Sequence, residues 1–180
     1  DVPAVLSAVE PDAVAQAIAQ SLASGERVAI LLGNAAVNAP TATTIAANAQ
    51  LIAELTGAKL GFLTSGANTV GGYLAGAVPV KGGKGAAAML SQPLKAYMVL
   101  HAEPNLDADN GAQALATLQA AEFVVALTPF ASGAREWANV MLPIAPFTET
   151  SGTFVNAQGT AQSFKGTATP RGQSRPAWKV

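Results

Sequence analysis

Five short apolar runs alternate with segments of helical spacing along the first four fifths of the sequence. The runs are RVAILLG (27–33), KLGFLTS (59–65), KAYMVLHA (95–102), EFVVALTPF (122–130) and NVMLPI (139–144). Apolar runs of this length are typical of strands buried on both faces of a parallel sheet. Strands that alternate with helices over short connections indicate an α/β domain with right-handed crossovers. The sequence therefore predicts a mainly parallel five-stranded, doubly wound sheet with helices on both faces.

The segments between these runs carry the end signals of helices. Asp12 stands at an N-cap position before AVAQAIAQSLAS, and Gly57 follows a predicted helix that has Pro40 in its first turn and ends at Thr56. Three glycines weaken the helical character of ANTVGGYLAGAVP, which is predicted to be a short helix or an ordered loop. Further helices are predicted over 86–92, 111–121 and 131–138.

The pattern changes after the fifth apolar run. Residues 153–156 and 160–164 read as two short strands around a tight turn, and residues 165–180 as an extended strap rich in Gly and Pro. We therefore predict an α/β region over 1–147 and a hairpin with a C-terminal strap over 148–180, packed together as one domain. Because the sequence begins Asp1-Val2-Pro3 without methionine, we expect it to be a piece of a longer polypeptide.

Composition limits the classes of partner. Half of the residues are hydrophobic and 12% are charged, which excludes an intrinsically disordered chain. The net charge of −1 provides no basic field for nucleic acid, and no apolar run approaches the roughly 20 residues of a membrane span. The sequence holds no cysteine, so this segment has no thiolate nucleophile and no Cys-bound zinc or iron-sulfur cluster. We expect neither nucleic-acid binding nor membrane insertion.

In an open α/β sheet, a ligand crevice is expected at the carboxyl ends of the strands. The loop 33–38 has one glycine where a dinucleotide fingerprint has three, so a polar loop that caps a helix is the simpler interpretation. The segment VKGGKG lacks the Ser or Thr of a phosphate loop and is predicted to be a surface turn.

His101 is the only histidine and follows the third apolar run. It is either a hydrogen-bonded loop residue or a general acid or base, and one imidazole beside acidic loop residues is too little for a metal site. Ser65 and Ser132 lack the glycine spacing of a nucleophile elbow. We therefore predict no catalytic residue and no metal ligand in this chain.

The segment TETSGTFVNAQGTAQSF (148–164) has ordered polar residues but one carboxylate. Glu149 is predicted to accept backbone N–H groups and fix the entry to the hairpin. Asn156 can bond to its own backbone in the turn, and Gly159 supplies a positive φ. Gln162 is available to bridge to a neighbouring loop.

These segments together resemble the molybdopterin oxidoreductase superfamily. The resemblance covers nearly the whole chain, including VAILLGNAAVN, LHAEPN and SRPAWKV, and its most specific part is a series of spaced residues: Leu142, Pro143, Glu149, Gly152, Thr153, Asn156, Gly159 and Gln162. Within the superfamily the chain is similar to the C-terminal part of the large iron-sulfur subunit of NADH-quinone oxidoreductase, the proton-translocating respiratory complex I of bacteria.

The resemblance implies an α/β domain that helps to hold the guanosine part of a pterin cofactor. Active members place an aspartate at the end of the fourth strand, where this sequence has Thr128-Pro129, and Ser132-Gly133-Ala134 replaces further polar residues. A site that recognises its ligand by paired hydrogen bonds loses on the order of 10⁴-fold in discrimination between ligands when one partner of the pair is missing. The cleft is therefore expected to be vestigial and without cofactor, its residues being Asn34, Asn68, His101, Asn105 and Thr128.

By this resemblance we expect a non-catalytic scaffold domain in the peripheral arm of complex I, on the cytoplasmic side of the inner membrane. Its partners would be other peripheral-arm subunits and the rest of its own chain, whose iron-sulfur clusters lie nearer the N-terminus. Two alternatives stay open. One is the cofactor-binding domain of an active molybdenum or tungsten pterin enzyme such as a formate dehydrogenase, and the other is a stand-alone nucleotide-binding domain.

Overall fold

The computed structural model describes residues 9–180, so Asp1-Val2-Pro3 lies outside the described residues. The chain forms two compact units, Asp1–Thr69 and Val70–Val180. The boundary predicted after residue 147 stays a prediction. Among residues 9–180, no helix has both the length and the apolar character needed to cross a bilayer.

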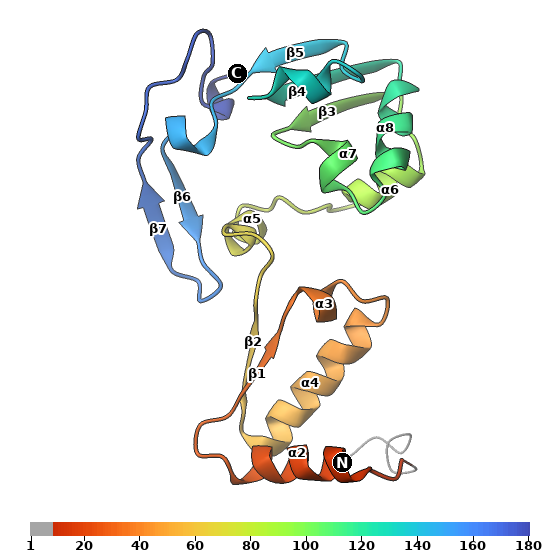
Figure 1. Cartoon of the computed structure of the whole chain (residues 1–180), viewed down its shortest axis with the longest axis vertical. Helices are drawn as coiled ribbons and strands as arrows, with labels where there is room; N and C mark the ends of the chain where they lie inside the picture. Colours follow the sequence, from red (N-terminus) through yellow and green to blue (C-terminus); the bar gives the residue numbers. More distant parts are fainter. Residues whose placement is uncertain (1–8) are drawn as a thin grey trace. The chain divides into compact units, whose positions relative to one another are not determined.

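From residue 9 onward, the first unit contains a two-stranded parallel sheet with helices α2, α3 and α4 (Figure 1). Its elements in chain order are α2 (Ala13–Ser24), β1 (Ala29–Leu32), α3 (Asn34–Val37), α4 (Ala42–Thr56) and β2 (Lys59–Phe62). Asp12 caps α2, since its Oδ1 accepts the Ala15 N–H at 2.7 Å, and Gly57 ends α4 with φ +70°. Both end signals are confirmed.

Two details of the first unit differ from the sequence prediction. Pro40 lies before α4 rather than in its first turn, because the chain makes a separate turn in which the Ala42 N–H bonds to the Ala39 carbonyl at 2.9 Å. The segment predicted as a polar loop forms the single-turn helix α3, in which Gly33 accepts N–H groups from Ala36 and Val37.

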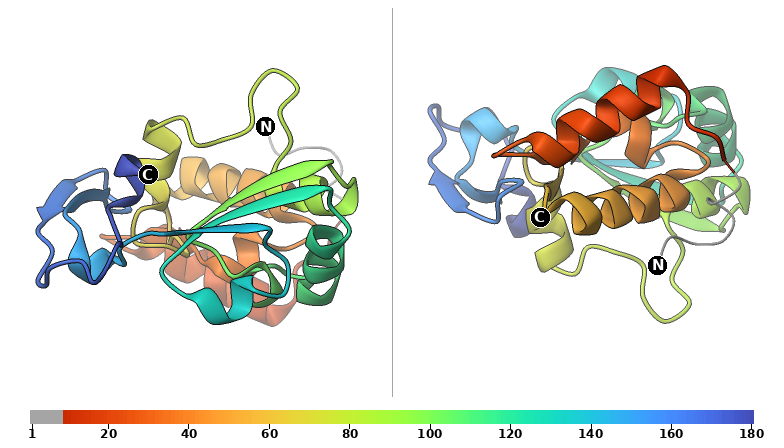
Figure 2. Two further views of the ribbon diagram at one scale, coloured as in Figure 1. Left: turned by 90° about the horizontal axis from the view of Figure 1, so that it is seen from above. Right: turned by 90° about the horizontal axis from the view of Figure 1, so that it is seen from below.

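The second unit is built on a three-stranded parallel sheet of order β3-β4-β5, whose strands lie side by side in Figure 2. Its elements are α5 (Thr69–Leu74, which begins at the boundary), α6 (Ala86–Ser91), β3 (Ala96–Leu100), α7 (Pro104–Asp107), α8 (Gly111–Gln119), β4 (Phe123–Thr128), α9 (Ala131–Ala134) and β5 (Val140–Pro143). The predicted turn at VKGGKG is closed by the Gly83 N–H, which donates to the Val80 carbonyl at 3.0 Å.

The α/β class with parallel strands is confirmed. The five strands lie in two sheets, of two and three strands, so a single five-stranded sheet with helices on both faces is not confirmed and stays a prediction. The helix predicted over 131–138 ends at Ala134. Beyond Ala134 the chain continues in turns, in which the N–H groups of Glu136 and Trp137 bond to carbonyls three residues before them, at 3.4 and 3.2 Å.

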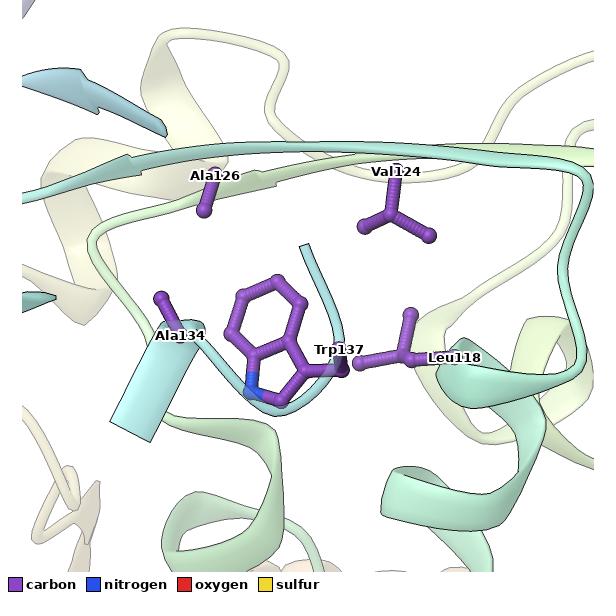
Figure 3. Close-up of a cluster of buried hydrophobic side chains, with 5 residues drawn as sticks. All are labelled: Leu118, Val124, Ala126, Ala134 and Trp137. Atoms are coloured by element: carbon purple, nitrogen blue, oxygen red, sulfur yellow. The ribbon is translucent and has the colours of Figure 1, made fainter. Parts of the chain in front are cut away.

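The core of the second unit lies between one face of the sheet and the helices α8 and α9. Figure 3 shows the indole of Trp137 between Ala134 and Leu118, beneath Val124 and Ala126 of β4. Strand β4 is buried along most of its length, as a central strand should be. Strand β3 instead alternates, with Met98 74% and Leu100 56% exposed. The prediction of burial on both faces is wrong for β3 and also for β1, where Leu31 is 58% exposed.

The hairpin predicted after residue 152 is confirmed. Strands β6 (Gly152–Val155) and β7 (Ala161–Phe164) pair antiparallel, with Gly152 opposite Phe164. A 3₁₀ turn, η1 (Phe147–Glu149), precedes them and another, η2 (Ala177–Lys179), ends the strap. The strap, residues 165–180, returns to the three-stranded sheet, where Arg175 forms a parallel bridge with Ile144 just beyond β5.

Candidate functional site

The carboxyl ends of β3 and β4 are adjacent, because Leu100 lies opposite Leu127 in the parallel register. His101 continues this pairing with its main chain, donating its N–H to the Leu127 carbonyl at 2.8 Å. The residue has φ +52°, a left-handed conformation that is uncommon outside glycine. The chain therefore turns sharply after β3 and leaves the imidazole exposed at the sheet edge.

Glu103 lies on the same edge and faces the segment that follows β4. The main-chain N–H of Glu103 donates to Oδ2 of Asp107 at 2.7 Å, and this bond fixes the start of α7. Its Oε1 lies 3.3 Å from the point where a Cβ on Gly133 would stand. The absence of a side chain at Gly133 thus makes room for a carboxylate between the β3 and β4 loops. The sequence indicated Glu103 only as an acidic neighbour of His101, and the facing glycine is visible only in the fold.

Thr128 ends β4 and is buried, with 8% of its surface exposed. Its Oγ1 accepts the Phe130 N–H at 3.0 Å and lies 3.1 Å from the Phe130 carbonyl, to which it can donate. The hydroxyl therefore closes a local turn over Pro129, and both of its hydrogen-bonding functions are directed to the main chain.

Asn105, in the single-turn helix α7, is partly buried. Its Oδ1 is shielded from solvent and has no hydrogen-bond partner among residues 9–180. Gly111 at the start of α8 packs directly against the Asn105 carbonyl, so the two short helices meet closely at this point. An acceptor left unpaired at the carboxyl edge of a sheet is costly and requires an explanation.

The predicted cleft residues are divided between the two units. Asn34, exposed at the start of α3, and Asn68 belong to the first unit, whereas His101, Asn105 and Thr128 belong to the second. Within the second unit the structure brings together the ends of β3 and β4, and Glu103 joins them. Among the described residues, no group of three His, Asp or Glu side chains could hold a metal ion.

The spaced signature residues lie around the hairpin and its neighbours. Pro143 ends β5, and Gln162 is exposed on β7. Glu149 Oε2 accepts the Arg171 N–H of the strap at 3.3 Å, so it links η1 to the strap. Thr153 Oγ1 lies 2.9 Å from Ser163 Oγ across the two strands.

The turn of the hairpin is organised by one amide. Asn156 Oδ1 accepts the N–H groups of Gln158 and Thr160, each at 3.0 Å. Gly159 has φ +82° in the same turn. These contacts are structural, since each of them ends on main chain within the hairpin.

Comparison with known proteins adds two findings. A model of the molybdopterin oxidoreductase family matches residues 12–180. Over 90 residues the chain is 33% identical to the probable oxidoreductase YjgC of Bacillus subtilis (strain 168), an alignment that covers 50% of this chain and 9% of that protein. The chain thus corresponds to a small part of this relative's length. With nearly all of its residues matched, this chain belongs to the molybdopterin oxidoreductase family.

Proposed function

We propose that this chain is a non-catalytic scaffold domain, equivalent to the C-terminal part of the large iron-sulfur subunit of NADH-quinone oxidoreductase. The observation that supports this proposal is the closed turn at the end of β4. Thr128 there bonds to the main chain of Phe130, and the next residue is Pro129, whose side chain has no polar atom.

The residues at the end of β4 do not fit the guanosine end of a pterin cofactor. Guanine presents adjacent N–H donors, which a carboxylate can accept as a pair. The hydroxyl of Thr128 has one oxygen, and that oxygen is already bonded within its own turn. In this proposal the domain therefore takes no part in pterin chemistry.

In this proposal the domain works by packing. It would stabilise the large subunit, whose clusters lie in its N-terminal part, and would contact other subunits of the peripheral arm on the cytoplasmic side of the membrane. Electrons would pass from NADH to quinone elsewhere in the assembly. Support for docking comes from large apolar side chains that are exposed in the second unit: Tyr73, Leu74, Met98, Leu100, Leu106, Phe130, Phe147 and Trp178.

A second candidate is the cofactor-binding domain of an active molybdenum or tungsten pterin oxidoreductase, such as a formate dehydrogenase. It is favoured by the likeness to a protein named as a probable oxidoreductase. The carboxylate of Glu103 against Gly133 also favours it, because this group supplies an acceptor at the same sheet edge.

Titration calorimetry of this chain with GDP distinguishes the two candidate functions. The scaffold role predicts no saturable heat at millimolar GDP. Micromolar binding that is abolished in Glu103→Gln, with GMP and ADP as comparison ligands, would overturn the scaffold role and support the cofactor-binding domain.

Isolation of the native assembly tests the respiratory part of the proposal. A tag on the chromosomal copy should recover, from membranes in mild detergent, an assembly that oxidises NADH, reduces quinone and shows iron-sulfur signals in electron paramagnetic resonance. Stoichiometric molybdenum or tungsten by elemental analysis, together with formate oxidation, would contradict it.

A further inference from the structure

We propose that a hollow beside the end of β5 binds a small oxyanion with the chemistry of phosphate. The hollow has a volume of about 520 Å³ and is lined by Pro143, residues 172–175 and residues 179–180. This inference does not depend on the proposed scaffold function, because every group that carries it lies outside the edge formed by β3 and β4.

Two basic side chains border the hollow. Arg175 and Lys179 both line it, and no Asp or Glu side chain does. The strap 165–180 as a whole contains Lys165, Arg171, Arg175 and Lys179 but no acidic residue, although the entire chain has a net charge of −1. Among residues 9–180 the only salt bridge joins Lys95 to Glu122, so neither cation in the hollow is neutralised by a side chain of the described region.

The main chain holds Arg175 in place. It forms a bridge with Ile144, and its carbonyl accepts the Ala145 N–H at 2.7 Å. Both of these partners are buried, so the anchor belongs to the rigid end of the sheet. A cation on a fixed backbone loses less conformational entropy on binding than one on a free loop.

The second cation is positioned by the closing turn. The Lys179 N–H donates to the Pro176 carbonyl at 2.8 Å, and its Nζ lies 4.8 Å from the centre of the Trp178 ring. A lysine at this distance from an indole is weakly held by a cation–π interaction and stays available to an anion. Both charges thus border one hollow from opposite ends of the segment 175–179.

Neutral donors complete the site. The hydroxyl of Ser174 and the amide of Gln173 belong to residues that line the same hollow. A guanidinium donates two parallel N–H groups to an oxyanion, whereas an ammonium acts as a point charge. The guanidinium of Arg175, the ammonium of Lys179 and the two neutral donors together suit an anion with three or more equivalent oxygens, which is the chemistry of phosphate.

The experiment is a titration of the full ¹⁵N-labelled chain with sodium phosphate at constant ionic strength, with sodium chloride as the reference. We expect saturable shifts of the amides of Ser174, Arg175 and Lys179 in the millimolar range. Glutarate serves as the second arm: stronger binding of phosphate supports the proposal, and stronger binding of glutarate would overturn it.

The variant Arg175→Gln keeps the backbone bridge and should weaken binding about tenfold, because a charge-assisted bidentate contact is lost. Lys95→Gln, which changes an exposed lysine outside the hollow, should leave binding unchanged. Shifts that match those in chloride, or that survive in Arg175→Gln, would overturn the proposal.

Discussion

Gly152 lies opposite Phe164 in the hairpin, and the far end of the Phe164 ring packs against it. A Cβ on Gly152 would stand 2.7 Å from Cζ of that ring, closer than carbon atoms approach without displacement. The same ring meets Phe154 edge to face, with centroids 4.8 Å apart and planes at 72°. An aromatic ring therefore covers the backbone of the opposite strand, and the absence of a side chain at position 152 sets the packing of the hairpin.

Substitution Gly152→Ala should destabilise the second unit by about 1–3 kcal/mol, because the added methyl group forces the ring of Phe164 or the strand to move. The measurement is urea unfolding followed by circular dichroism. Gly72→Ala is the matched control: it lies in α5 with no atom within 4 Å of the added carbon, and should stabilise by up to about 1 kcal/mol. Equal effects of the two variants would contradict the role given to Gly152.

Substitution Asn156→Ala should cost about 1–2 kcal/mol, since two main-chain N–H groups of the turn lose their acceptor. Asn156→Asp keeps an oxygen in place and should retain most of the stability. Amide hydrogen exchange at Gln158 and Thr160 provides the local measurement. Unchanged protection in Asn156→Ala would show that the turn does not depend on this side chain.

Asn139 extends the ladder at the start of β5. Its Oδ1 accepts the Val124 N–H at 2.6 Å, and its own N–H donates to the Val124 carbonyl at 2.9 Å. Because Val124 is buried, Asn139→Ala leaves its N–H unpaired and should cost about 1–3 kcal/mol. Asn139→Asp should be close to wild type in thermal unfolding, and an equally large loss in both variants would point to a steric rather than a hydrogen-bonding role.

Trp137 and Trp178 should respond differently to truncation. Trp137 is 6% exposed and lies in the core of the second unit, so Trp137→Ala should destabilise by about 3–5 kcal/mol. Trp178 is 77% exposed, so Trp178→Ala should change the free energy of unfolding by less than about 0.5 kcal/mol. Chemical denaturation of the two variants in parallel tests the packing of Trp137, which a small loss in Trp137→Ala would contradict.

The sequence predicts the positions of β1 to β5 because each one is a separate apolar run, and it predicts β6 and β7 from the tight turn between them. It predicts the ends of α2 and α4 because Asp12 and Gly57 have local roles. It does not predict α3 or α7, since a four-residue helix makes a single turn and leaves no periodic signal. Helix α9 is shorter than predicted because the N–H groups of Glu136 and Trp137 bond to carbonyls three residues back, which local sequence periodicity does not distinguish from a continued helix.

The candidate site is only partly predictable for a similar reason. The missing aspartate at Thr128 follows from the resemblance alone, but its closed turn with Phe130 depends on main-chain geometry. The approach of Glu103 to Gly133 joins two loops that are separate in the sequence, and only the parallel pairing of β3 with β4 brings them together.

The hydrogen bond from Ala145 to the carbonyl of Arg175 closes a lobe that leaves the sheet and returns to it. Residues 146–174, which include the hairpin, form this lobe. Its two ends are joined at the bridge between Arg175 and the buried residue Ile144. The hairpin can unfold and refold locally while the bonds of Ile144 and Ala145 to Arg175 persist. Its fluctuations therefore need not spread into the parallel sheet.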